Sequence, residues 1–296
     1  MPPTLENIVP WGRSFDEYQR MFSLDSNDLR GSILGFADGP ASFNAELTEM
    51  GKSVVSFDPI YQFTAAEIGS RIEAVAPRMI DYAAQHADEF VWTSRLPDVT
   101  TLAKQRRQAM SRFLDDFADG LDAGRYVAAE VAVPLTKRAA ARWAFARSRW
   151  SLESIERNPR SPTPQVAVPL TERAAARSSF ARSRWSLESS ESRSKSPTPQ
   201  VPNLPFADRQ FDLTVCSHFL FLYSQQLSLQ FHVAAIEELL RVAKEVRIFP
   251  LLQLDSQKSP YVEPITATFR QAGRTVEHVV VDYEFQRGAN QMMRIQ

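Results

Sequence analysis

The sequence reads SILGFADGPASFNAEL from Ser32 to Leu47 and SVVSFDP from Ser53 to Pro59. Each segment opens with a short apolar run, which is typical of a buried β-strand. Pro40 lies where a helix can begin, and Gly51 lies where that helix can end. The order strand, helix, strand over so few residues favours an α/β fold with a parallel sheet.

The alternation of strands and helices continues along the chain. Further strands are predicted at residues 125–129, 211–216, 245–251, 275–285 and 291–295, and further helices at residues 64–87, 98–121, 227–243 and 265–272. This order predicts a doubly wound, mostly parallel sheet, in which the last two strands are adjacent and antiparallel.

A tandem repeat interrupts this pattern. Residues 131–165 and 166–200 are identical at 27 of 35 positions and follow each other without a gap. Each copy has an Ala/Arg-rich half that can form a short basic helix and a Ser/Pro-rich half that is typical of disorder. When the repeat is removed, GRYVAAE joins VPNLPFADRQFDLTVCSHF as strand, short loop, strand. We therefore expect one domain built from residues 1–130 and 201–296, with residues 131–200 as an insert.

The charge of the chain is divided unequally. Residues 131–200 contain 13 basic and 5 acidic residues, a net charge of +8, whereas the remainder has 21 basic and 30 acidic residues, a net charge of −9. The insert is either a basic arm for RNA or an acidic partner, or a tolerated surface insertion. The acidic remainder favours a small-molecule substrate over a polyanion, and binding of nucleic acid is expected only through the insert.

Several function classes have no support in the sequence. Cys216 is the one cysteine, and the four histidines are scattered, so we expect neither an intrachain disulfide nor a metal site. The start of the chain lacks a basic, then apolar, signal segment, and no apolar run approaches the ~20 residues that span a bilayer. These features predict a cytoplasmic protein without membrane association. They leave the oligomeric state open.

Polar residues follow the first two predicted strands. Gly35, Ala37, Asp38 and Gly39 form a turn of small residues before a helix, which allows a ligand to approach the backbone closely. Asp58 closes the second strand, where a carboxylate can accept hydrogen bonds from both hydroxyl groups of a ribose. Each feature alone is also an ordinary turn, but together they favour a ligand that contains adenosine.

At this point the chain resembles the class I S-adenosylmethionine-dependent methyltransferases. ILGFADGPASFNAEL is similar to the first motif of that family, and VVSFDP is similar to the second. LPFADRQFDLTVCSHFLFLY resembles the segment that holds the fourth strand, and EELLRVAKEVRIFPL resembles the following helix and strand. The resemblance covers residues 12–130 and 201–296. It implies a Rossmann-like sheet of seven strands with an antiparallel last strand, and S-adenosyl-L-methionine as the cofactor.

The resemblance also implies roles for individual residues. Asp58 would bind the ribose, Glu130 would lie near the adenine, and Arg13 would pair with the carboxylate of the cofactor. The turn residues named above and Ser217 would complete the cofactor site. Two positions depart from the family: Gly35 stands where an acidic residue is usual, and Ala37 stands where glycine is usual.

His218 is the candidate catalytic residue. It follows the fourth predicted strand and can accept a proton from a hydroxyl or amine of a methyl acceptor. Among Phe219, Phe221 and Tyr223 it can equally be a packed, structural histidine. Methyl transfer mainly needs correct placement of the reactants and a dry site, so the lack of a catalytic triad agrees with an enzyme. The lack of a triad agrees equally with a non-catalytic binding module of the same fold. The sequence does not identify the methyl acceptor.

Overall fold

Seven strands form one sheet in the computed structural model, which describes residues 9–128 and 203–296. The strands are β1 (Ser32–Phe36), β2 (Ser53–Asp58), β3 (Tyr126–Ala128), β4 (Phe211–Ser217), β5 (Ala243–Phe249), β6 (Val276–Val280) and β7 (Gln291–Ile295). Their order in the sheet is β3-β2-β1-β4-β5-β7-β6, and β7 runs in the direction opposite to the other six strands. The predicted α/β fold with a mostly parallel, seven-stranded sheet is therefore confirmed.

The sheet contains residues from both sides of the repeat. Strand β4, which follows the repeat, pairs in parallel with β1 from the start of the chain, with Phe36 opposite Cys216. The chain first moves outward from β1 to β2 and β3, and then returns to the other side of β1 with β4. The reversal makes the boundary between β1 and β4 the topological switch point of the sheet. The predictions for the insert at residues 131–200 lie outside the described residues.

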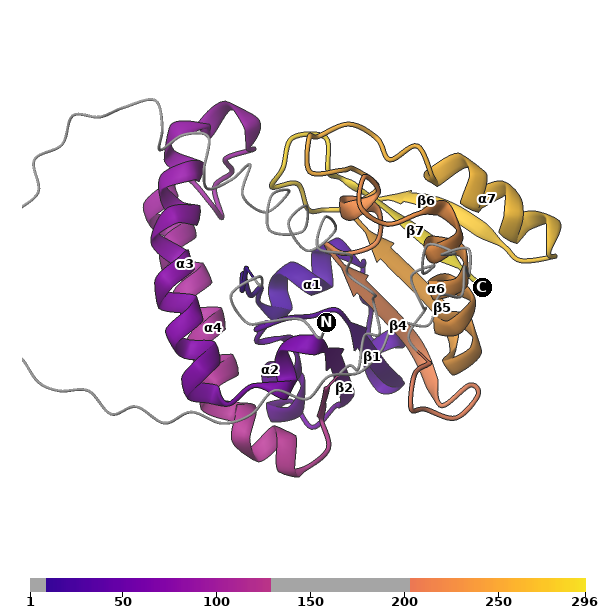
Figure 1. Ribbon diagram of the computed structural model, residues 1–296, viewed down its shortest axis with the longest axis horizontal. Helices are drawn as coiled ribbons and strands as arrows, with labels where there is room; N and C mark the ends of the chain where they lie inside the picture. The colour runs from indigo at the N-terminus through magenta and orange to yellow at the C-terminus, as the bar shows by residue number, and fades with distance from the viewer. Residues whose placement is uncertain (1–8, 129–202) are drawn as a thin grey trace, which may run out of the picture.

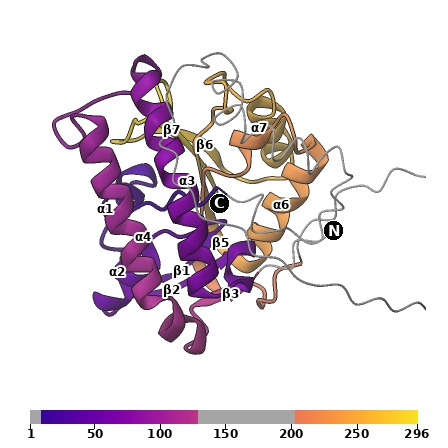
Figure 2. The same ribbon diagram turned by 60° about the vertical axis from the view of Figure 1, so that its left-hand side comes forward.

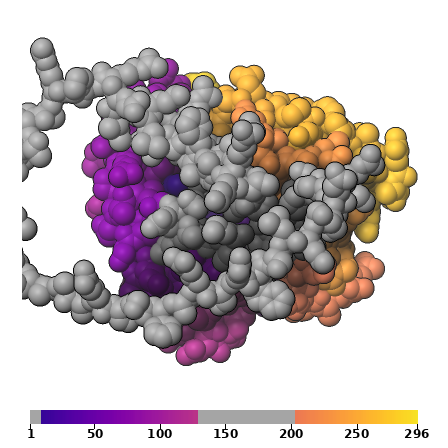
Figure 3. Space-filling view, in the orientation of Figure 1, coloured from indigo at the N-terminus to yellow at the C-terminus, as the bar shows by residue number. Residues whose placement is uncertain are grey.

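Helices cover both faces of the sheet. Figure 1 and Figure 2 show α1, α2, α3 and α4 on one face and α6 and α7 on the other. Figure 3 shows the same arrangement as a surface, with α3 on one flank and α7 on the opposite flank. The helices are α1 (Phe15–Met21), α2 (Phe43–Glu49), α3 (Ala65–Gln85), α4 (Val99–Asp122), α6 (Leu229–Val242) and α7 (Val262–Gln271). Short 3₁₀ turns are η2 (Asp28–Arg30), η3 (Pro59–Gln62), η4 (Ala87–Glu89) and η5 (Phe221–Tyr223).

Local signals explain where the helices begin. The side chains of Ser14 and Thr64 cap α1 and α3, and each forms a capping box with the glutamate three residues later. Asp98 and Ser228 cap α4 and α6 by accepting a backbone N–H. The predicted helices at residues 64–87, 98–121, 227–243 and 265–272 are therefore confirmed, with ends that differ by one to three residues.

Two predicted strands have different bounds in the structure. Strand β5 begins at Ala243, directly after α6, and ends at Phe249 because Pro250 has no N–H to continue the ladder. The predicted strand at 275–285 ends at Val280. Beyond it the chain leaves the sheet, and Phe285 stacks on Phe90 with ring centroids 4.6 Å apart. Packing of aromatic side chains, which a strand pattern does not reveal, shortens this strand.

Two apolar clusters hold the helices to the sheet. On one face, Leu34 and Ile248 pack with α6 and α7. On the other face, Ile33 and Val215 pack with α1 and α2. A third cluster, which includes Phe113 and Tyr126, joins α3 and α4 to the β3 edge. None of the helices among the described residues combines the length and the apolar character needed to cross a membrane.

Candidate functional site

Unusual backbone conformations mark the carboxyl ends of β1 and β4. Ala37 and His218, each the first residue beyond its strand, have φ of +62° and +53°. Residues other than glycine rarely adopt this left-handed conformation, and such residues concentrate at functional sites. Because β1 and β4 are neighbours, both residues lie at the topological switch point, where sheets of this type bind ligands.

The Asp38 carboxylate lies inside this edge of the sheet and is only 8 % exposed. Its two oxygens accept hydrogen bonds from the Tyr18 hydroxyl at 2.9 Å and from the Ser56 hydroxyl at 2.7 Å. A Cβ atom on Gly35 would be only 1.7 Å from Asp38 Oδ2. Gly35 is therefore required because the Asp38 carboxylate occupies the space of a side chain at residue 35.

The surroundings of Asp38 favour its neutral form. Burial raises the pKa of Asp38 to about 7, although the hydrogen bonds from Ser56 and Tyr18 lower it, and the nearby Asp58 carboxylate raises it further. Among the described residues, no cation contributes to this shift in the pKa of Asp38. A carboxyl group that titrates near neutral pH inside a predicted site is typical of functional chemistry.

Asp58 connects the ends of β1 and β2. Its Oδ2 accepts the Gly39 N–H at 2.9 Å, and its Oδ1 accepts the Ile60 N–H at 2.8 Å. The Tyr61 hydroxyl donates to the Gly39 carbonyl at 2.9 Å. Gly39 has φ of +57°, and a Cβ atom there would meet none of the residues that the structure describes within 4 Å. The partly buried Asp58 carboxylate therefore lies beside an open stretch of backbone.

Ser217 and His218 occupy the end of β4. The Ser217 hydroxyl and His218 Nδ1 are 2.9 Å apart, and the His218 N–H donates to the Phe249 carbonyl at 2.7 Å. No hydrogen bond joins His218 Nε2 to any residue that the structure describes. Burial lowers the pKa of His218 well below its ordinary value, and the charges of Arg13 and Arg106 lower it further. The imidazole is therefore neutral, which a proton acceptor requires.

Arg13 precedes α1 and faces the same region. Its Nη1 donates to the Trp11 carbonyl at 3.4 Å, while its Nε is buried without a hydrogen-bond partner among the described residues. The carbonyl of Arg13 accepts the Ser42 N–H at 3.0 Å, so the start of α2 holds this segment in place. The charge of Arg13 influences both His218 and Tyr18. An anionic group of a ligand would satisfy this guanidinium.

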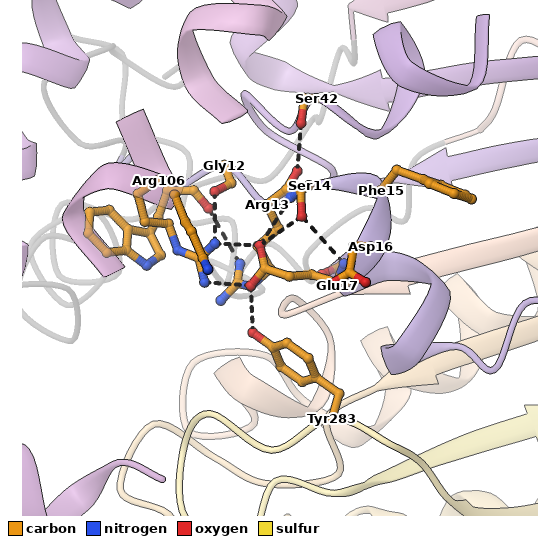
Figure 4. Close-up of polar contacts among 12 residues, drawn as sticks. Gly12, Arg13, Ser14, Phe15, Asp16, Glu17, Ser42, Arg106 and Tyr283 are labelled. Atoms are coloured by element: carbon orange, nitrogen blue, oxygen red, sulfur yellow. Dashed lines mark hydrogen bonds and ion pairs between the residues drawn. The ribbon is translucent and has the colours of Figure 1, made fainter. Parts of the chain in front are cut away.

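A buried ion pair anchors α1 next to the site (Figure 4). Arg106 Nη1 and Nη2 donate to the two carboxylate oxygens of Glu17 at 2.5 and 2.7 Å. The Tyr283 hydroxyl and the Ser14 N–H also donate to Glu17, at 2.9 and 3.0 Å. Burial opposes the charge of Glu17, but the charge and hydrogen bonds of Arg106 outweigh it and lower the pKa of Glu17 to about 2. This cluster joins α1, α4 and the segment before β7.

The structure brings together most of the predicted site residues. Asp38, Asp58, Ser217 and His218 lie at the carboxyl ends of adjacent strands, together with Ala37, Gly39 and Arg13. Gly35 lies within β1 and provides room for Asp38 rather than a contact surface. Glu130 lies outside the described residues.

Sequence reasoning missed four buried polar residues around the site, namely Glu17, Tyr18, Ser56 and Arg106. One signal was present for Arg106, which takes an apolar-face position of α4 between Leu102 and Met110. A second signal was the Ser14-x-x-Glu17 capping box. Nothing in the pattern indicated the contact of Tyr18 with Asp38, because the two residues come from different elements.

Comparisons with known proteins give little further information. No family model matches the chain, and no solved structure matches it. The chain is 25 % identical to the uncharacterized protein MJ0045 of Methanocaldococcus jannaschii, over 98 % of this chain and 97 % of that protein. Among the described residues, no group of three or more His, Cys, Asp or Glu side chains is arranged to hold a metal ion.

Proposed function

We propose that this protein is an S-adenosylmethionine-dependent methyltransferase that acts on a small-molecule acceptor. The observation that carries the proposal is the convergence of Asp38, Asp58 and His218 at the switch point of a seven-stranded sheet whose last strand is antiparallel. Sheets of this kind bind nucleotide-containing ligands at this place. The resemblance of the motifs adds the identity of the ligand.

The residues present fit such a ligand. Asp58 ends β2 at the edge where sheets of this type bind ligands, and a carboxylate there can accept hydrogen bonds from the hydroxyl groups of a ribose. The backbone at Gly39 has room for close approach, since even a Cβ atom would meet no described residue within 4 Å. The unpartnered Nε of Arg13 suits a carboxylate. The missing acidic side chain at Gly35 is replaced in space by the Asp38 carboxylate.

Methyl transfer mainly requires that the protein hold the two reactants in the correct positions. Bound S-adenosylmethionine supplies an electrophilic methyl group, and the acceptor must meet it in line. His218, neutral and with Nε2 free of described protein partners, can take the proton that a hydroxyl or amine acceptor loses. The apolar ring of Phe249, 5.4 Å from the His218 ring, helps to exclude water from this side.

The first test is calorimetric titration of S-adenosylmethionine and S-adenosylhomocysteine into the full-length protein. We expect binding of both, and binding about 10- to 100-fold weaker in Asp58→Ala, because hydrogen bonds to a charged group are lost. Asp98→Ala is the matched control, since Asp98 likewise accepts a backbone N–H, at the start of α4. Thermal unfolding of both variants separates a lost ligand contact from a loosened fold.

Binding that is equally strong in Asp58→Ala would remove Asp58 from the site, and failure of the wild-type protein to bind either ligand would overturn the proposal. Catalysis is then tested by incubating the protein with methyl-labelled S-adenosylmethionine and the small-molecule fraction of a cell extract. Label should appear in a small molecule with the wild-type protein and not with Asp58→Ala. Binding without transfer would indicate a non-catalytic binding module.

A further inference from the structure

Asn44 is a polar residue on the buried side of helix α2, and only 1 % of it is exposed. A buried amide is costly unless it is hydrogen-bonded, so the partners of Asn44 indicate its role. Its Nδ2 donates to the Ser56 hydroxyl at 3.2 Å and to the Arg125 carbonyl at 3.0 Å. Its Oδ1 accepts from Arg125 Nη1 at 2.7 Å. Asn44 therefore connects α2 to Ser56 on β2 and to the residue before β3.

The Arg125 guanidinium determines which way the Asn44 amide points. A guanidinium can only donate, so the Asn44 atom that it meets is the oxygen Oδ1, and Nδ2 faces Ser56. Arg125 is itself held by both carboxylate oxygens of Asp116, at 2.7 and 2.8 Å. The Arg125 carbonyl also accepts the Ser56 N–H at 2.8 Å. A reversed amide would lose these hydrogen bonds, so the orientation of Asn44 is fixed.

The fixed amide in turn directs the Ser56 hydroxyl. This hydroxyl has one proton to donate. Its oxygen accepts from Asn44 Nδ2, which has no lone pair to accept in return, so the proton goes to Asp38 Oδ2, 2.7 Å away. The Tyr18 hydroxyl donates to the other oxygen, Oδ1, at 2.9 Å. Asp38 thus meets one donor at each oxygen, an arrangement that favours the ionised carboxylate.

We propose that Asn44 is a positioning residue of the candidate site, which acts through Ser56 to hold the Asp38 carboxylate as an acceptor of hydrogen bonds. Arg125, Asn44, Ser56 and Asp38 follow one another through hydrogen bonds of 2.7, 3.2 and 2.7 Å. They connect the β3 edge of the sheet to the turn at the switch point. This role of Asn44 rests on the proposed function only for the ligand that Asp38 serves.

A purely structural role for Asn44 leads to a different expectation. As a bridge between α2 and the strands, Asn44 would influence the stability of the fold and nothing at Asp38. As a positioning residue it also influences the pKa of Asp38, which burial raises to about 7 and which the Ser56 hydrogen bond lowers. Without Asn44, the Ser56 hydroxyl is free to accept a proton from neutral Asp38. The pKa of Asp38 should then rise, because its neutral form gains a partner.

Other titratable groups also surround Asp38. They come from α1, β2, η3, β3 and β4, and are Tyr18, Asp58, Tyr61, Tyr126 and Cys216. Burial raises the pKa of the three tyrosines and of the thiol, so none of these four groups titrates near pH 7. The Asp58 carboxylate raises the pKa of Asp38. The charged group that meets Asn44 is Arg125, which is paired with Asp116.

The test measures the pKa of Asp38 by ¹³C NMR of its carboxyl carbon in the full-length protein without cofactor. The signal is assigned by its loss in Asp38→Asn. We expect Asn44→Ala to raise the pKa of Asp38 by about 0.5 to 1, which corresponds to one neutral hydrogen bond. Thr48→Val is the matched control on the same helix, because Thr48 contacts Arg125 Nη1 at 3.2 Å and Asn44 Oδ1 at 3.4 Å. The pKa of Asp38 should be unchanged in this control.

A double-mutant cycle tests whether the effect passes through Ser56. Ser56→Ala removes the hydroxyl itself and should raise the pKa of Asp38 at least as much as Asn44→Ala does. In the Ser56→Ala background, Asn44→Ala should then add nothing, because the two residues act through one hydrogen bond. If the two shifts add in full, Asn44 does not act through Ser56 and the proposal is wrong.

A measurement that keeps Asn44 covers the case in which Asn44→Ala does not fold. In the wild-type protein, the side-chain ¹⁵N–¹H signals of Asn44 should shift with pH at the same midpoint as Asp38. In Ser56→Ala they should not respond. Asn44 signals that are constant through the titration of Asp38, or an unchanged pKa in folded Asn44→Ala, would overturn the proposal. Because no ligand is present, this failure is distinct from failure of the protein to bind S-adenosylmethionine.

Discussion

Neighbouring residues of helix α1 face two buried polar clusters with opposite electrostatics. Glu17 meets the Arg106 guanidinium, and its pKa falls to about 2 despite burial. Tyr18 meets Asp38, whose partners are uncharged hydroxyl groups, and burial raises the pKa of Asp38 to about 7. Both carboxyl groups are at least 90 % buried, so the presence or absence of a cation decides the result.

The difference in pKa indicates a structural role for the Glu17 cluster and a chemical role for the Asp38 cluster. The low pKa of Glu17 keeps this cluster charged at neutral pH, as expected of a structural ion pair. The Asp38 cluster changes its charge near neutral pH, as expected of a group that exchanges protons. One short helix therefore fastens the segment that carries Arg13 and also places Tyr18 in the site.

The largest effect is expected from Arg106→Met. It leaves the Glu17 charge buried without its cation, which should lower the free energy of unfolding by about 3–5 kcal/mol. Urea denaturation measures the change. Arg112→Met is the matched control on the same helix, because Arg112 is itself exposed and its ion pairs with Glu46 and Glu49 should contribute less than about 1 kcal/mol. Equal losses in the two variants would contradict an anchoring role for the buried pair.

A smaller effect on stability is expected from Asp38→Asn. Here the ionised carboxylate destabilises the folded protein, whereas the ionised Glu17 stabilises it. The folded pKa of Asp38 lies above its unfolded value of 3.8, so protonation favours the folded state, and wild-type stability falls as the pH rises from about 4 to about 7. The asparagine does not ionise and avoids this loss. The free energy of unfolding of the variant minus that of the wild type should therefore be greater at pH 8 than at pH 4, by roughly 2–4 kcal/mol.

Urea denaturation of both proteins at pH 4, 6 and 8 measures this difference. Glu17→Gln sharpens the comparison, because the folded pKa of Glu17 lies below its unfolded value. The stability that Glu17 contributes is present above about pH 4.5 and is lost as the pH falls toward 2. Parallel stability curves for Asp38→Asn and the wild type between pH 4 and pH 7 would show that Asp38 does not titrate as described.

The smallest effect is expected from Ser14→Ala. The Ser14 side chain accepts the Glu17 N–H at 3.4 Å and thereby caps the helix that both clusters share. Loss of a cap lowers the free energy of unfolding by about 0.5–1 kcal/mol. Thr64→Ala removes the equivalent cap of α3, which has no buried ion pair behind it. Thermal unfolding should give similar losses, and a much larger loss for Ser14→Ala would mean that the cap also supports the Glu17 cluster.

Much of the fold was predictable because its signals are local. The apolar runs that became β1, β2, β4 and β7 are each bounded within a few residues, and the caps of α3 and α4 lie at their predicted starts. The bounds of β5 and β6 were wrong. Pro250 ends β5, and the stacking of Phe285 on Phe90, far apart in the chain, draws the chain away from the sheet after Val280.

The sequence by itself determined the alternation of strands and helices, the place of Asp58 and His218 at strand ends, and the resemblance of the motifs. Only the tertiary structure decided that Asp38 occupies the space above Gly35 and meets Tyr18 and Ser56. The physical reason is distance along the chain. Periodicity and capping depend on residues within one or two turns, whereas a pKa depends on groups that the fold brings together from remote segments.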